Sequence, residues 1–189
     1  NPEEVVVPAK FDIASIPSWY VGAENPSANT TVQYYAAADK TWKVFSNATS
    51  GVTLNEENQC QSQVTLWKYA GQDQKGLSYR LQTNSLVMGG KEYVDEAGKI
   101  KLPNILAYSY QNMTIGDNNT KELIIKIGFN KTLVDYDEDS NTLKLKKDIK
   151  LDEPLIIDGD VTIDLNGHTL TGADGENTIE LPDADDKLT

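Results

Sequence analysis

The sequence predicts an all-β protein, in which an N-terminal β-sandwich precedes a short segment that forms either a β-helix-like coil or a hairpin. Two observations support this prediction. Apolar residues recur at every second position in several stretches, and polar sequences rich in Gly, Asn and Asp separate these stretches. Helix signals are sparse, and short helices are expected only at residues 34–39 and 54–63.

Alternation of apolar and polar residues is clearest at residues 122–129 and 143–151. In the second stretch lysines gather on one face, and Lys147 alone breaks the pattern. Such stretches are typical of strands with one buried face. Further strands are expected where β-branched and aromatic residues concentrate, at residues 42–45, 64–70, 77–81 and 105–110.

The charge balance excludes two classes of partner. Basic residues number 17 and acidic residues 29, which gives a net charge of −12. A chain this acidic repels nucleic acid and anionic lipid surfaces. Its apolar runs are far shorter than the roughly 18 residues that a membrane-spanning helix requires. We therefore expect neither nucleic-acid binding nor membrane insertion of this segment.

The composition also indicates a compartment. Cys60 is the only cysteine, so no intrachain disulfide forms. The chain is rich in Lys, Asn and Thr, and Arg80 is its single arginine. In this composition it resembles modules of bacterial cell-surface proteins, which implies an extracellular or cell-surface location.

The character of the sequence changes after Phe129. Up to that point long polar loops separate the expected strands, whereas the strands that follow are short and closely spaced. We therefore divide the chain into a β-sandwich-like domain at residues 1–130 and a β-helix-like strand segment with an acidic tail at residues 131–189. The acidic stretch at residues 135–139 is expected to be a connector or a hairpin tip.

Residues 143–172 are the most informative stretch. Short apolar strands alternate there with the turn sequences Asp-Glu-Pro, Asp-Gly-Asp and Asn-Gly. Gly and Asn suit the left-handed backbone at the corners of a coil. The segments at residues 154–157, 161–167 and 169–170 resemble the opening rungs of right-handed parallel β-helices of the pectate-lyase-like superfamily, which are found in many bacterial surface proteins.

The same stretch allows a second interpretation. The Asn-Gly pair at residues 166–167 is a strong type I′ turn signal, so an antiparallel hairpin with residues 169–171 competes with the coil. Residues 178–181 are expected to form one more strand, paired with residues 161–171. Because apolar strand faces follow one another, the residues expected to be buried are Leu155, Ile157, Val161, Ile163 and Leu165.

The resemblance brings no catalytic residues. Enzymes of this superfamily carry acidic residues, and in the lyases a basic residue and calcium, on rungs from the middle of the helix, and no position here matches them. His168 has Asp164 as an orienting acid, but neither serine nor cysteine accompanies it. We therefore expect a surface histidine in a turn and a protein that is not an enzyme.

A calcium site is the one metal-binding candidate. Asp135, Asp137 and Asp139 alternate with the spacing that calcium loops use. Two positions depart from that pattern, because Ser140 replaces the glycine of such loops and Lys146 replaces the bidentate glutamate. A solvated acidic hairpin tip is the competing interpretation, and no other cofactor is expected.

Aromatic residues concentrate in the first 110 positions and indicate a candidate sugar-binding face. The candidates are Trp19, Tyr20, Trp67 and Tyr69, of which the last two share one face of an expected strand. Sugar-binding modules place exposed rings against the apolar side of a pyranose. The competing interpretation is that these rings form the sandwich core, where aromatics supply much of the buried area.

Together these observations favour a non-enzymatic secreted or cell-surface module, engaged in adhesion or forming part of a larger modular surface protein. A carbohydrate-binding module, or an accessory domain of a polysaccharide-degrading enzyme, is the alternative. The expected partners are glycans or proteins of a host or cell surface. An exposed strip of Trp and Tyr rings would favour the alternative.

Overall fold

The computed structural model describes residues 2–53, 59–69, 78–111, 113–114 and 122–189, and the side chains of residues 9–45, 78–111 and 122–189. Within these ranges the chain consists of strands and connecting loops, with one short 3-10 helix, η1 (Val21–Ala23). No helix of the described residues is long and apolar enough to span a membrane. The prediction of an all-β fold is confirmed.

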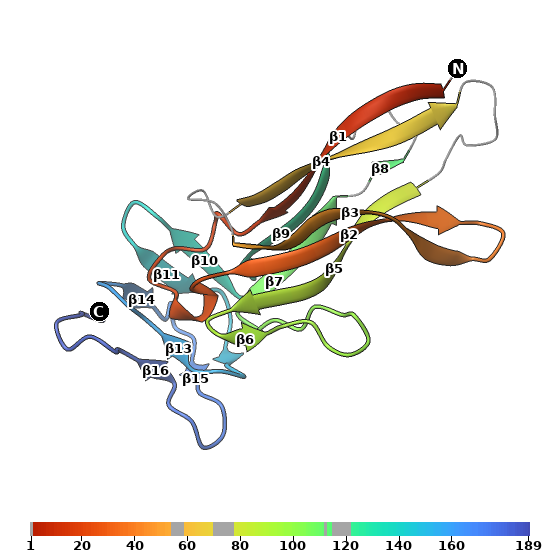
Figure 1. Ribbon diagram of the computed structural model, residues 1–189. Helices are drawn as coiled ribbons and strands as arrows, with labels where there is room; N and C mark the ends of the chain where they lie inside the picture. The colour runs from red at the N-terminus through yellow and green to blue at the C-terminus, as the bar shows by residue number, and fades with distance from the viewer. Residues whose placement is uncertain (1, 54–58, 70–77, 112, 115–121) are drawn as a thin grey trace.

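Two sheets form the N-terminal part of the molecule (Figure 1). The first sheet contains, in spatial order, β4 (Gln59–Tyr69), β1 (Pro2–Asp12), β9 (Leu123–Phe129) and β7 (Leu106–Gln111). The second contains β3 (Thr41–Thr53), β2 (Ser27–Ala36), β5 (Ser78–Met88) and β6 (Lys91–Glu92), and β8 (Met113–Thr114) also pairs with β5. Neighbouring strands are antiparallel except β1 and β9, which are parallel.

The two sheets enclose a hydrophobic core because their strands alternate. In the first sheet Phe11, Ile125 and Ile127 are fully buried. In the second sheet Leu81 and Leu86 are equally inaccessible, and they belong to the same hydrophobic cluster. The arrangement is sandwich-like, and burial of these apolar side chains is its main source of stability.

Neither of the two expected short helices is present in the described residues. Residues 34–36 belong to β2, residues 37–40 form a turn, and residues 59–63 belong to β4. Residues 54–58 lie outside the described part. The ring of Tyr34 packs edge-on against Phe45 of the adjacent strand, with centroids 6.5 Å apart. Cross-strand packing of this kind overrides a weak local preference for helix.

From Val134 onwards the chain winds into short coils. β10 (Val134–Asp137) and β11 (Thr142–Leu145) form an antiparallel hairpin whose tip is residues 138–141, so the acidic stretch at residues 135–139 is partly strand and partly tip. The first coil then contains β11, β12 (Ile149–Lys150) and β13 (Leu155–Ile156). The second coil contains β14 (Thr162–Asp164), β15 (Leu170–Thr171) and β16 (Ile179–Glu180).

Each strand of the second coil pairs in parallel with the corresponding strand of the first: β14 with β11, β15 with β12, and β16 with β13. The β-helix-like alternative is therefore present and the 166–171 hairpin is not. The strand expected at residues 178–181 exists as β16, but its predicted partner is wrong. It pairs with β13 because a coil places each strand beside its counterpart one turn earlier.

The expected amphipathic ribbon at residues 143–151 is two strands, β11 and β12, and the break between them contains Lys147, the residue that disturbs the alternation. Of the predicted interior residues, Leu155, Ile157 and Val161 are buried and Ile163 is half-buried. Leu165 is 47% exposed, which contradicts the prediction. It follows the end of β14 and enters the turn, where the amide of His168 donates to its carbonyl.

Candidate functional site

Four aromatic rings meet at the junction between the sandwich and the coils. Trp19 stacks on Phe129 with ring centroids 5.9 Å apart, and its indole N–H donates to the hydroxyl of Tyr136 at 3.1 Å. Tyr20 meets Phe129 edge-on, also at 5.9 Å. The rings come from the loop after β1, from the end of β9 and from β10. Residues from both expected domains therefore form one continuous hydrophobic cluster.

The prediction that Trp19 and Tyr20 bind sugar with exposed rings is contradicted. Their exposed fractions are 4% and 6%, so neither ring offers a face to a ligand. They are buried because the coils cover them, an arrangement that composition alone does not reveal. Trp67 and Tyr69 belong to β4, and their side chains lie outside the described part of the structure.

A polar contact lies beside this aromatic cluster. The hydroxyl of Tyr93 donates to a carboxylate oxygen of Glu153 at 3.3 Å, and Lys91 forms an ion pair with the same carboxylate at 3.0 Å. Burial, together with the charge of Glu153, raises the pKa of Tyr93 to about 12. Burial likewise raises the pKa of Tyr20 well above its ordinary value. Both phenols are therefore neutral at physiological pH.

The free edge of the first coil is covered at three places, one of them by β10 and two by residues of the sandwich side. At the first place, β10 pairs with the edge of β11 that faces away from β14. At the second, Asn104 donates from its side-chain amide to the carbonyl of Lys150 at 2.6 Å. The backbone amide of Asn104 also donates to the carboxylate of Asp152 at 3.1 Å.

The third contact involves the loop after β1. Tyr20 and Ile157 form an antiparallel bridge, and the amide of Asp158 donates to the carbonyl of Trp19 at 2.9 Å. The amide of Ile157 points the opposite way, to Glu180 in the second coil. Successive peptide groups of a strand point to opposite sides. The groups of the first coil that bond to the second coil point one way, and the three contacts lie on the opposite side of the first coil. We call these contacts the cap.

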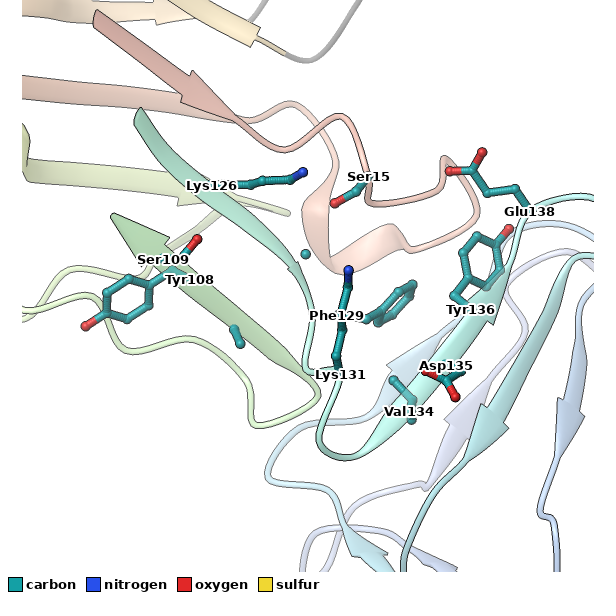
Figure 2. A pocket seen from close by; sticks show the side chains of 12 residues that line it. Ser15, Tyr108, Ser109, Lys126, Phe129, Lys131, Val134, Asp135, Tyr136 and Glu138 are labelled. Carbon is teal, nitrogen blue, oxygen red and sulfur yellow. The ribbon is translucent and has the colours of Figure 1, made fainter. Parts of the chain in front are cut away.

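A hollow of about 630 Å³ lies beside the cap, between β7, β9 and β10. Figure 2 shows Lys126 extending from β9 towards Ser15, and the ring of Phe129 lying between Lys131 and Tyr136. The outer faces of β7 and β9 form its floor. Gly128 allows Ser15 to approach β9 closely, because a Cβ there would lie 2.7 Å from the hydroxyl oxygen of Ser15.

The hollow has mixed chemistry. Lys126 and Lys131 carry positive charge on one side, and Asp135 and Glu138 carry negative charge on the other. The hydroxyl of Ser15 donates to the carbonyl of Ile127 at 3.3 Å. Its lining residues include neither histidine nor cysteine.

The three aspartates proposed as calcium ligands are not brought together. The carboxylate of Asp137 accepts hydrogen bonds from the hydroxyl of Ser140 and the amide of Asp139, which lower its pKa. Asp135 lies 3.9 Å from the ammonium group of Lys146. Among the described residues, no group of three or more His, Cys, Asp or Glu side chains lies close enough to hold a metal ion.

His168 lies at a corner of the second coil, where its Nδ1 is 3.5 Å from a carboxylate oxygen of Asp148 in the first coil. The acid proposed from the sequence, Asp164, accepts the amide of Asn166 instead. Asn166 in turn donates from its side chain to the carbonyl of Leu145. Polar side chains at this corner thus tie one coil to the other.

Comparisons of the chain with protein-family models, with curated proteins and with solved structures found no significant match.

Proposed function

We propose that this chain is a non-enzymatic module of an extracellular or cell-surface protein, in which the sandwich supports and caps a β-helix-like segment, and that the module serves adhesion. The observation that supports this proposal most directly is the cap. Each side of the first coil has a partner from the sandwich or from the β10 hairpin. An uncovered edge would expose unpaired N–H and C=O groups, which invite association with other chains.

The junction supports a mechanical role. A module that bears load between a surface and a partner needs its parts held at a fixed angle. Here Trp19 is buried between Phe129 and Tyr136, and the hydrophobic cluster continues from the sandwich into the coils. Because the same side chains stabilise both parts, neither part moves without exposing apolar surface.

The cap is tested by Asn104→Ala in the full chain. This change removes the donor to the carbonyl of Lys150 and leaves that edge of the first coil without its side-chain partner. We expect faster cleavage by thermolysin within residues 149–157, located by mass spectrometry. The matched control is Asn177→Ala, because Asn177 bonds within its own coil, to Glu180. Equal cleavage of both variants and the wild type would contradict capping.

Adhesion needs a separate test. Beads that carry the full chain are passed under flow over layers of epithelial cells, with beads carrying heat-unfolded chain of the same net charge as the control. We expect retention of the folded chain alone. Equal retention of the two kinds of bead would remove adhesion from the proposal and leave the structural role of the cap intact.

A further inference from the structure

The outer face of the second sheet carries a cluster of partly exposed side chains from three strands. Gln33 and Tyr35 lie on β2, Trp42 on β3 and Arg80 on β5. We call these four residues the Arg80 platform. In the sheet register Gln33 lies opposite Arg80, and Tyr35 lies opposite Trp42. The platform is remote from the cap, which involves other elements.

The register places these side chains outside and their neighbours inside. Tyr34 and Tyr79 face the core, and Phe45, two residues after the partner of Tyr34 on β3, lies on the same face and meets both rings. Gln33 and Tyr35 flank Tyr34 and therefore point outward. The exposed rings thus have no share in the core that would account for their presence.

Arg80 is held in a fixed orientation. It extends across β2, so that its guanidinium carbon lies 4.2 Å from the ring centroid of Trp42. Its Nε donates to the side-chain oxygen of Gln33 at 3.0 Å. Trp42 in turn packs against Tyr35 with centroids 5.4 Å apart. Stacking and one hydrogen bond orient a guanidinium group in the way that planar recognition of an anion requires.

The charge surroundings of Arg80 are unusual for this chain. The sequence has 29 acidic residues and one arginine. Among the described residues, none places a carboxylate in an ion pair with that arginine, and its terminal N–H groups have no acceptor. An oriented cation with free donors, in a protein of net charge −12, favours an anionic ligand at this point.

We propose that the Arg80 platform binds an acidic glycan, whose carboxylate or sulfate accepts hydrogen bonds from Arg80 while a sugar ring packs beside Tyr35 and Trp42. A glycan fits better than a peptide strand or helix, because a strand adds to a sheet edge and a helix enters a groove. The platform is instead a flat face in the middle of three paired strands, continued by Val44, which is 61% exposed.

The test is isothermal titration of the full chain with three oligosaccharides of matched length: carboxylated hyaluronate, sulfated dextran and neutral dextran. We expect binding of at least one anionic oligosaccharide and none of neutral dextran. The net charge of −12 opposes non-specific binding of polyanions, so any binding reports a specific site. The two anionic probes distinguish a carboxylate from a sulfate as the recognised group.

Two variants locate the site. Arg80→Lys keeps the positive charge but loses the planar fork, and we expect binding about tenfold weaker or worse. Trp42→Ala removes the stacking surface and is expected to weaken binding as well. Lys126→Gln is the matched control, because it removes one positive charge from the hollow instead and should leave binding unchanged. Thermal melts confirm that each variant is folded.

Four results would overturn the proposal. These are the absence of binding to both anionic probes, equal binding of neutral dextran, unchanged binding by Arg80→Lys, and a loss with Lys126→Gln that matches the loss with Arg80→Lys. A peptide with a free carboxylate that competes more strongly than either glycan would also overturn it. None of these results bears on the cap, so the proposed structural role stands or falls separately.

Discussion

The sandwich and the coiled segment are both built of strands, but their ladders differ in length and direction. β1 is an 11-residue strand paired antiparallel to β4 along its length, whereas β12 is a 2-residue strand paired in parallel with β15. A ladder of two residues contributes few hydrogen bonds. The coils therefore depend on interior packing, on their corners and on the cap, whereas the sandwich depends on long ladders around one core.

The largest expected effects come from matched deletions in the two parts. Phe11 in the sandwich and Leu155 in the first coil are both buried, at 0% and 1% exposed. Replacing either with Ala leaves a cavity, and we expect losses of about 3–5 kcal/mol for Phe11 and about 2–5 kcal/mol for Leu155. Because one hydrophobic cluster contains both residues, each variant should unfold in a single transition.

Urea unfolding followed by circular dichroism and by tryptophan fluorescence measures both quantities. The comparison fails if Leu155→Ala produces an early transition that leaves the sandwich folded. In that case the coils would be an independent unit, and the junction would contribute little to the stability of the whole.

A smaller effect is expected at the corners of the second coil. A Cβ on Gly172 would lie 2.5 Å from the side-chain oxygen of Thr178 and 3.0 Å from its Cα. Gly172→Ala therefore forces the backbone apart, at a cost of about 1–3 kcal/mol. Gly167 has open space around it but a φ of +78°, so Gly167→Ala is expected to cost about 1–2 kcal/mol.

These two glycine variants separate crowding from backbone strain. Replacing Thr178 with Gly removes the contact with the side-chain oxygen but not the contact with Cα. It should therefore restore part of the stability of Gly172→Ala and none of that of Gly167→Ala, as measured by thermal melts. If Thr178→Gly raises the stability of both glycine variants equally, or of neither, then close contact with Thr178 is not the reason that residue 172 is glycine.

The smallest effect is a loss of stability at alkaline pH that arises at the junction. The pKa of Tyr93 is raised to about 12 in the folded protein, so the folded state holds this proton more tightly than the unfolded chain does. Stability from this group is complete below about pH 10, the pKa of an unperturbed tyrosine, and is lost as the pH rises towards 12. Melting temperatures measured from pH 8 to pH 12 should fall accordingly.

Tyr93→Phe is the control for that titration, because it has no ionisable phenol. Its melting temperature is expected to fall less steeply above pH 10 than that of the wild type. Parallel curves for the two proteins would show that Tyr93 titrates as it does in the unfolded chain. Tyr20, whose pKa burial also raises, contributes to both curves.

Sequence reasoning predicted the coils more closely than the cap. The Asn-Gly and Asp-Gly-Asp corners are local signals, and Asn166, Gly159 and Gly167 do adopt positive φ. The choice between coil and hairpin is not local, because Asn-Gly suits both, and the parallel pairing of β14 with β11 decides it. Likewise, nothing near Asn104 in the sequence indicates that Lys150 and Asp152 are its partners.

The candidate sites also depended on contacts between residues that are far apart in the sequence. Composition draws attention to the aromatic residues as a group, but only packing distinguishes a buried ring such as Trp19 from a partly exposed ring such as Trp42. Alternation does contain part of that information. Adjacent residues of a strand point to opposite faces, so Tyr34 and Tyr35 place one ring on each face of β2. The helix expected at residues 34–39 hid this signal.

If the cap holds the sandwich and the coils together, the two parts form one cooperative unit. Native-state hydrogen exchange across a urea series measures whether they open together. The informative amides are those of Ile149, Leu155 and Ile157, which donate to the second coil, compared with the amides of β5 and β9. We expect both sets to converge on the same free energy of opening. Exchange of the coil amides through a separate opening of lower free energy, with the sheets still protected, would contradict it.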